Sequence, residues 1–280
     1  MGLIDDIKAN AQDNGTKIQS SEAADIEKLF NSLFYAKKNM DEEVKFVKQM
    51  FTRGGDSTER YGLHTSAIIV SDDKFCYREQ VLSLLYKQAQ GEHVPQNLIR
   101  IFEEGNAIHE KWQRLFIRGG LCKAEDCDFS RFYKKYEVGY TPDAIITING
   151  EKYVVEIKSV NTYQFMKMTS HPTAKKQVNM YMHFSGIHKG IILCEDKNTQ
   201  NFKVFVVKYD PDVVAPYLER LEAVQFYKNR VFEENKMVKR CEQCTSKLCK
   251  RAIGCPMKDA CWNTGKGRVR LDVQKASDRN

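Results

Sequence analysis

The chain has 280 residues, of which 42% are hydrophobic and 29% are charged, and its formal net charge is +7. This length fits one large domain or two small ones, and the composition is that of an ordinary globular protein, which argues against a largely disordered, collagen-like or membrane-spanning chain. No segment approaches the roughly 18 apolar residues of a membrane helix, and the N-terminus has neither the basic start nor the apolar run of a secretory signal.

The first 120 residues have the pattern of amphipathic helices. Between residues 23 and 50, apolar side chains recur at spacings of three and four, which is typical of a helix. Residues 52–56 break that pattern and are predicted to form a linker. Further helices are expected over residues 75–90 and 96–118, the second of them ending before Gly119-Gly120.

The centre of the chain changes to strand-forming sequence. Residues 144–148 and 153–160 are rich in β-branched residues and are separated by Asn149-Gly150, the strongest short-range signal for a β-hairpin. A helix over residues 173–184, strands at 190–194 and 203–207, and a helix over 211–239 are predicted next. Helices on either side of a central run of strands predict an α/β fold with a central mixed sheet flanked by helices.

The predicted hairpin brings charged residues together. A two-residue turn at Asn149-Gly150 places Asp143 opposite Glu156, with Lys158 on the same face and Ile157 on the other. Like charges directly opposite each other destabilise a sheet, and a divalent cation such as Mg²⁺ or Mn²⁺ would offset their repulsion. The alternative is a simple ion pair between Lys158 and a carboxylate on an exposed sheet face.

The last 45 residues are rich in cysteine and in positive charge. Residues 236–280 contain 12 Lys or Arg and 4 Asp or Glu, which indicates either a polyanionic partner or a solvated tail that keeps the protein soluble. Five of the nine cysteines fall within residues 241–261, a density typical of a metal site in a reducing compartment. Four thiolates suit either Zn²⁺ or an iron–sulfur cluster.

Several of these residues resemble a known family. Pro142-Asp143 followed by Glu156-Ile157-Lys158 resembles the PD-(D/E)XK nuclease motif. The segment around His109 resembles the upstream helix motif of RecB-like nucleases, and Gln177 with Tyr181 resembles their QxxxY motif. The resemblance covers residues 64–262 and implies a restriction-endonuclease-like fold. It divides the chain into an N-terminal helical extension (1–60), a nuclease core (61–240) and a basic, Cys-rich metal-binding segment (241–280).

The resemblance also implies a role for each motif residue. The expected metal ligands are His109, Asp143, Glu156 and the backbone carbonyl of Ile157. Lys158 would act on the attacking water, while Gln177 and Tyr181 would hold DNA or orient Lys158. Lys175 and Lys176, just before Gln177, are expected to contact DNA phosphates.

Cys76 resembles the isolated early cysteine of RecB-like nucleases that carry a [4Fe–4S] cluster, including the CRISPR-associated exonucleases and AddB. By this resemblance the expected cluster ligands are Cys76, Cys249, Cys255 and Cys261. The family's usual C-x2-C-x5-C spacing is absent, however. The alternative is a Zn²⁺ site made by Cys241, Cys244, Cys249 and Cys255, with Cys76 as a buried thiol. Three further cysteines are expected to be core or surface thiols: Cys122, Cys127 and Cys194.

The expected function is that of an Mg²⁺- or Mn²⁺-dependent deoxyribonuclease. An exonuclease that acts in DNA recombination, repair or phage DNA metabolism fits best. It would work in the cytoplasm of a bacterial, archaeal or phage-infected cell, alongside a possible helicase or recombination partner. Two alternatives remain: a non-catalytic DNA- or protein-binding module with a nuclease fold, and a zinc-dependent nucleic-acid-binding protein.

Overall fold

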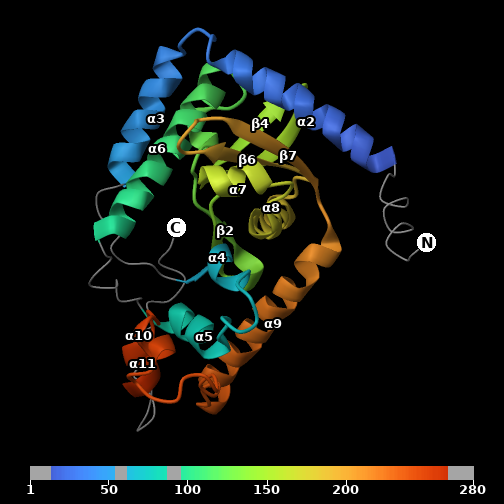
Figure 1. Ribbon diagram of the computed structural model, residues 1–280. Helices are drawn as coiled ribbons and strands as arrows, with labels where there is room; N and C mark the ends of the chain where they lie inside the picture. The colour runs from blue at the N-terminus through green and yellow to red at the C-terminus, as the bar shows by residue number, and fades with distance from the viewer. Residues whose placement is uncertain (1–13, 54–61, 87–95, 264–280) are drawn as a thin grey trace, which may run out of the picture. The chain divides into compact units, whose positions relative to one another are not determined.

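The computed structural model describes residues 14–53, 62–86 and 96–263 (Figure 1). The chain divides into two compact units, each assembled from three separate segments. The first, here called the sheet unit, comprises residues 1–48, 101–129 and 142–209, and the second, the helical unit, comprises 49–100, 130–141 and 210–280. The domain boundaries at residues 60 and 240 stay a prediction. Parts of the expected linker and of the expected helix over 75–90, and the last 17 residues of the basic tail, lie outside the described residues.

The sheet unit is built on a four-stranded mixed sheet with the strand order β4-β5-β6-β7. Its strands are β4 (Ala144–Ile148), β5 (Glu151–Val160), β6 (Lys189–Asp196) and β7 (Phe202–Lys208). Strand β5 pairs antiparallel with β4 and parallel with β6, and β6 pairs antiparallel with β7. The parallel pair requires a crossover, which α7 (Thr162–Lys167) and α8 (Pro172–Ser185) provide. The predicted α/β fold with a mixed sheet is confirmed.

The β4–β5 hairpin has the register that its turn predicts. Asn149 and Gly150 have φ values of 52° and 81°, as a two-residue hairpin turn of the I′ type requires. The pairs run from Ile148 with Glu151 to Ala144 with Val155. The ladder ends there, so Asp143 lies immediately outside β4.

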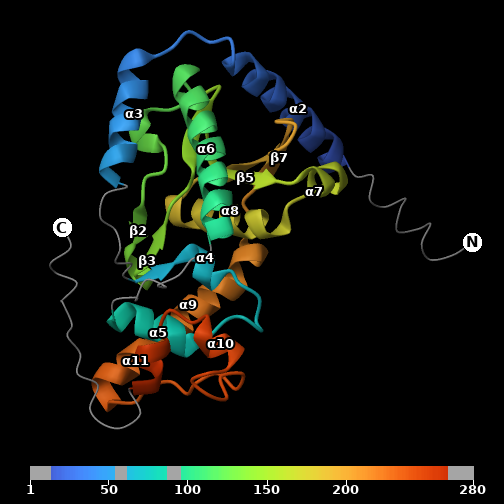
Figure 2. The same cartoon turned by 60° about the vertical axis from the view of Figure 1, so that its left-hand side comes forward.

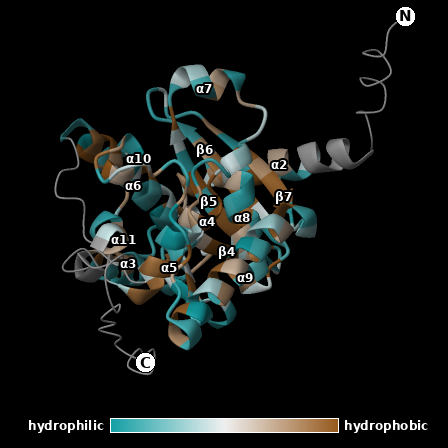
Figure 3. Ribbon diagram, turned by 90° about the horizontal axis from the view of Figure 1, so that it is seen from below, coloured by the Kyte–Doolittle hydropathy of each residue, from teal (hydrophilic) through white to brown (hydrophobic). Residues whose placement is uncertain are grey.

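Helices cover this sheet and supply much of its core. The helices that lie wholly or mainly in the sheet unit, besides α7 and α8, are α2 (Asn14–Leu33), α3 (Met40–Arg53) and α6 (Gln96–Arg118). Helix α6 has the predicted bounds, whereas the helical stretch expected over residues 23–50 is two helices, α2 and α3, joined by a short turn. Figure 3 shows apolar residues concentrated on the strands of the sheet.

The N-terminal helices are packed into the sheet unit. Phe30 of α2 is fully buried, with its ring centroid 5.9 Å from that of Trp112 and 5.1 Å from that of Phe116, both on α6. Glu43 of α3 is also buried, and its carboxylate accepts a hydrogen bond of 3.1 Å from Arg118 at the end of α6. These contacts make α2 and α3 part of the core of this unit.

The helical unit contains a small sheet and several helices (Figure 2). Its three strands are β1 (Leu63–His64), β3 (Val138–Tyr140) and β2 (Arg131–Tyr133), in that order. Its helices are α4 (Thr65–Ile68), α5 (Tyr77–Leu85), α9 (Pro211–Glu234), α10 (Lys250–Ile253) and α11 (Lys258–Asn263). Arg220 of α9 is buried and donates to the carbonyls of Ile68 and Val70, both at 2.6 Å. Among the described helices, none has the length and apolar character needed to cross a bilayer.

Truncating Phe30 tests whether α2 belongs to the core of the sheet unit. We expect Phe30→Ala to lower the free energy of unfolding by about 3–5 kcal/mol, because it leaves a cavity beside Trp112 and Phe116. Tyr35→Ala is the control, since Tyr35 is 92% exposed and its loss should change little. Urea denaturation followed by far-UV circular dichroism measures both variants. Equal stability of the two would show that α2 does not pack on this core.

Candidate active site

Asp143 is held at the start of β4 by its backbone and by its side chain. Its carbonyl accepts hydrogen bonds from the side chain of Gln113 (2.8 Å) and the N–H of Asp128 (3.0 Å). Its carboxylate Oδ2 accepts from the N–H of Ile157 at 2.6 Å, and Oδ1 lies 3.1 Å from Nδ1 of His109. This links the hairpin to helix α6, which carries both His109 and Gln113.

Glu156 and Lys158 form an ion pair in the interior. Glu156 is only 2% exposed, and its Oε1 accepts a hydrogen bond from the Lys158 ammonium. Its other oxygen, Oε2, is buried and has no hydrogen-bond partner among the described residues. Burial and the nearby charge of Asp143 raise the pKa of Glu156 to about 8. The ion pair considered from the sequence therefore exists, but on a covered face of the sheet.

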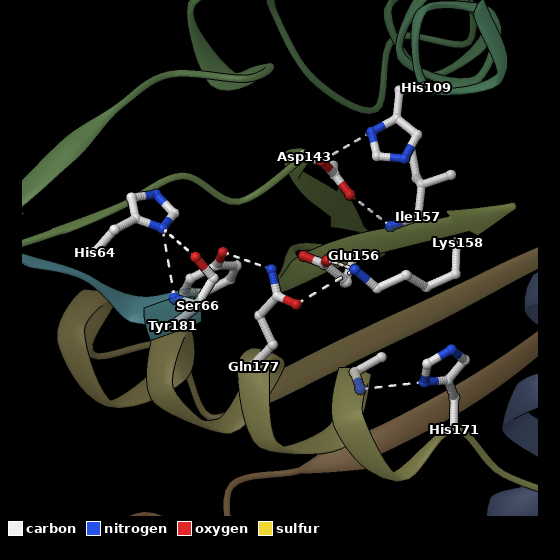
Figure 4. A network of polar contacts seen from close by, with 11 residues as sticks. His64, Ser66, His109, Asp143, Glu156, Ile157, Lys158, His171, Gln177 and Tyr181 are labelled. Carbon is white, nitrogen blue, oxygen red and sulfur yellow. Dashed lines mark hydrogen bonds and ion pairs between the residues drawn. The ribbon is translucent and has the colours of Figure 1, made fainter. Parts of the chain in front are cut away.

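Helix α8 covers this face and extends the polar network (Figure 4). Gln177 accepts a hydrogen bond from Lys158 at 3.3 Å and donates one to the Tyr181 hydroxyl at 2.8 Å. Burial lowers the pKa of Lys158, but the charge of Glu156 and the hydrogen bond to it outweigh that effect, so the pKa is raised overall. The ammonium is thus held in its charged form between an acid and an amide.

The donor set suits a hard cation. Two carboxylates and a backbone carbonyl are oxygen ligands that suit Mg²⁺ or Mn²⁺, the imidazole of His109 would be a nitrogen ligand beside them, and the Oε2 atom of Glu156 is an acceptor without a partner among the described residues. In the described part of the chain, no three His, Cys, Asp or Glu side chains already converge in a metal-binding arrangement. At the proposed site, Lys158 occupies Oε1 of Glu156, and His109 and the Ile157 N–H occupy the two oxygens of Asp143. Binding a cation would require these side chains to exchange partners.

Reasoning from sequence did not single out two residues near this network. Gln113 lies one helical turn after His109 on α6, and its buried amide holds the Asp143 carbonyl. His171 caps the N-terminus of α8, and its pKa is lowered by burial and by the charge of Lys158. The sequence offered one signal for Gln113: it is a polar residue on an otherwise apolar helix face, four positions after His109. Lys175 is exposed in the first turn of α8 and Lys176 is partly exposed beside it.

The cysteines of the helical unit form a second polar cluster. The pKa of Cys76 is raised by burial and by the neighbouring Cys241 thiol. Burial and Cys241 also raise the pKa of Cys244 to about 12, and Cys249 and Cys76 are further neighbours of that thiol. The pKa of Cys255 is raised to about 12 by burial, with Glu79, Cys76 and Cys261 nearby. The fold thus brings Cys76 near three of the late cysteines, Cys241, Cys244 and Cys255.

Two arginines hold the segments that carry these thiols. Arg251 donates to the carbonyls of Asp73 (2.5 Å) and Lys74 (2.9 Å), just before Cys76. Arg78 donates to the carbonyl of Cys261 at 3.1 Å and to its sulfur at 3.2 Å. Cys249 caps α10, where its sulfur accepts the N–H of Ala252 at 3.4 Å. The remaining cysteines lie in the sheet unit: Cys127 and Cys194 are buried and Cys122 is half-buried.

Comparison with known proteins gives weak structural likenesses only. No protein-family model matches the chain, and no curated protein matches it. The alkaline exonuclease LHK-Exo from Laribacter hongkongensis is similar at 14% identity over 62% of this chain and 91% of that one, with TM-scores of 0.47 in its complex with dAMP and 0.44 in a second structure. The structure of SSO0001 is similar at 14% identity over 77% and 96%, with a TM-score of 0.38. These scores are too low to assign a family.

Metal binding can be measured without any substrate. We expect Mn²⁺ at about 100 times its dissociation constant to stabilise the folded chain by roughly 2.7 kcal/mol, because the cation binds only the native arrangement of carboxylates. Asp143→Asn should abolish most of this stabilisation. Asp25→Asn, at an exposed carboxylate on α2, should retain it. Thermal unfolding with and without Mn²⁺ is the measurement, and equal metal-induced shifts in both variants would place the cation elsewhere.

Proposed function

We propose that the protein is a metal-dependent DNA nuclease of the PD-(D/E)XK type that hydrolyses phosphodiester bonds. The observation that carries this proposal is the buried carboxylate of Glu156, which lies near Asp143, is paired with Lys158 and keeps one oxygen without a partner among the described residues. Burying such a group is unfavourable unless a positive charge or a donor compensates it. A divalent cation supplies that compensation and also the chemistry of phosphodiester hydrolysis.

The residues that would hold the cation are Asp143, Glu156, His109 and the carbonyl of Ile157. When bound, Mg²⁺ or Mn²⁺ would polarise a phosphoryl oxygen and lower the pKa of a water molecule. The protein's own groups position these ligands. In this structure His109 and the Ile157 N–H hold the Asp143 carboxylate in one orientation, from which it would turn to the cation. Gln113 fixes the backbone from which that carboxylate extends.

Lys158 is positioned to act on the reacting phosphate or on the attacking water. Its ammonium is held by Glu156 and by Gln177, and Tyr181 in turn orients the Gln177 amide. A fixed, charged ammonium can orient the water or stabilise the negative charge that develops on the phosphoryl oxygens. Gln177 and Tyr181 would therefore set the position of Lys158 and the approach of DNA.

The finer features of the function are part of the same proposal. We infer that the enzyme is an exonuclease that acts on DNA ends. It would serve recombination, repair or phage DNA metabolism in the cytoplasm, alongside a helicase or recombination partner. Lys175 and Lys176, at the start of α8, would contact the DNA phosphates. The cysteine cluster would hold a [4Fe–4S] cluster or Zn²⁺, and the proximity of Cys76 to Cys241, Cys244 and Cys255 supports a site that includes Cys76.

A cleavage assay tests the nuclease activity directly. Labelled linear and circular DNA is incubated with the protein in Mg²⁺ or Mn²⁺, and we expect metal-dependent loss of full-length DNA. Glu156→Gln and Lys158→Ala should each lower the rate by roughly 100- to 1,000-fold, because the first removes a proposed metal ligand and the second removes the positive charge that faces the reacting phosphate. Degradation restricted to linear DNA would identify an exonuclease.

Matched variants control for the loss of charge alone. Lys152→Ala removes an exposed lysine from the same strand as Lys158, and Glu219→Gln removes an exposed carboxylate from α9. Both should cleave DNA at the wild-type rate. Binding of DNA without cleavage in either metal would favour a binding module, and cleavage that survives both site substitutions would mean that other residues carry out the reaction.

Anaerobic purification tests the identity of the metal at the cysteines. If a [4Fe–4S] cluster is present, the protein will be brown, with broad absorbance at about 400 nm. Cys76→Ser should remove most of that absorbance, whereas Cys194→Ser, at a buried thiol of the sheet unit, should not. A colourless protein with one zinc ion per chain would exclude the iron–sulfur assignment.

A further inference from the structure

Helix α7 follows directly after β5, the strand that carries Lys158, and both of its ends are fixed. Asn161 is its N-cap, and the side chain of Asn161 accepts a hydrogen bond of 2.9 Å from the N–H of Gln164. Near the other end, the ammonium of Lys203 on β7 donates to the carbonyl of Phe165 at 2.8 Å. The helix is therefore held against the sheet unit, and Figure 3 shows it at the edge of that unit, beyond the end of β6.

The outward face of α7 carries two large apolar side chains. Tyr163 is 69% exposed and Met166 is 73% exposed, whereas Phe165 is buried beneath them. Residues 163, 166 and 167 are three or four positions apart and share one helix face. The ammonium of Lys167 donates to the Tyr163 hydroxyl at 2.5 Å and lies 3.9 Å from the centroid of the ring. These contacts restrain the ring, which lowers the entropy cost of placing a partner on it.

The charge around α7 favours an anionic partner. Residues 157–194, which connect β5 to β6, contain five lysines and no Asp or Glu. Lys167 and Lys175 are exposed, and Lys176 is partly exposed. The carboxylate of Asp196 packs against the start of α7, but it is only 1% exposed and accepts a hydrogen bond of 3.0 Å from the Thr162 hydroxyl. An exposed ring among lysines on an acid-free segment is complementary to a polyanion that also has flat apolar surfaces, as a single strand of nucleic acid does.

The distance along β5 places this face within reach of a strand that occupies the proposed active site. Asn161 follows Lys158 by three residues of extended chain, which span about 10 Å at roughly 3.3 Å per residue. That length corresponds to about three nucleotides of a stacked strand, at roughly 3.4 Å per nucleotide. A strand whose phosphate faces Lys158 can therefore lay a nearby base on α7.

We propose that the outward face of α7 is a docking surface for single-stranded DNA, on which the Tyr163 ring stacks against an unpaired base. The flexible thioether of Met166 packs beside the same base. The ammonium of Lys167 has three donors, so it can bind a phosphate while it keeps its hydrogen bond to Tyr163. This inference deepens the proposed nuclease function and rests on it, since it concerns the strand that the site would cut.

Oligonucleotides with and without bases test the stacking contact. A labelled oligothymidine is compared with a strand of equal length whose sugars and phosphates are kept and whose bases are absent. Fluorescence anisotropy in Ca²⁺, without Mg²⁺ or Mn²⁺, measures binding of each. We expect Tyr163→Ala to bind oligothymidine about tenfold more weakly, as the loss of one stacked base predicts, and to bind the abasic strand as the wild type does.

Matched variants separate the ring from other effects. Tyr163→Phe keeps the ring and should keep most of the affinity for oligothymidine. Tyr35→Ala removes another exposed tyrosine of the sheet unit, which is 92% exposed, and should bind both strands normally. Lys167→Ala should lower the slope of log K against log salt concentration by about one, whereas Tyr163→Ala should leave that slope unchanged, because only the lysine neutralises a phosphate.

The outcomes distinguish this surface from the nuclease function. Wild-type affinity for oligothymidine in Tyr163→Ala would overturn the docking surface, and so would an equal loss on the intact and abasic strands. A loss confined to blunt duplex DNA would also overturn it. If the wild-type protein cleaves no DNA in any metal, the nuclease function fails, but a loss that is selective for the intact strand would still support docking on α7.

Discussion

The site depends on one constraint: the acidic side chains of Asp143 and Glu156 lie close together on a covered face of the sheet. Burial and the nearby charge of Asp143 together raise the pKa of Glu156 to about 8. The ammonium of Lys158 binds one oxygen of Glu156 and offsets part of the free-energy cost of burying this side chain. The second oxygen has no partner among the described residues. Such an arrangement is unfavourable for stability, and the proposed binding of a cation would offset that cost.

The two helices that flank the hairpin contribute in different ways. Helix α6 fixes Asp143, because Gln113 holds its carbonyl while His109 contacts its carboxylate. Helix α8 acts on Lys158, through the amide of Gln177. The buried faces of these helices restrict the rotamers of the side chains, so the polar groups are preorganised by the apolar packing around them. The N-terminal helix α2, packed on α6, contributes to that rigidity.

The cysteine cluster depends on contacts between distant parts of the chain. Arg251 binds carbonyls of the segment before Cys76, and Arg78, two residues after Cys76, binds the carbonyl of Cys261. These arginines join the segment that carries the early cysteine to the segment that carries the late ones. The proposed cluster or zinc ion would add covalent ties between the same segments.

Local signals in the sequence determined part of this structure. The Asn149-Gly150 turn set the register of the hairpin, and apolar periodicity with a terminal Gly-Gly set the bounds of α6, because both effects act between residues close in sequence. The mixed sheet followed from the order of these elements. Only the tertiary structure decided that α8 buries Glu156, that Gln113 holds Asp143 and that His171 lies near Lys158. Those contacts join residues far apart in sequence, and they arise from how helices pack on the sheet, which no short motif specifies.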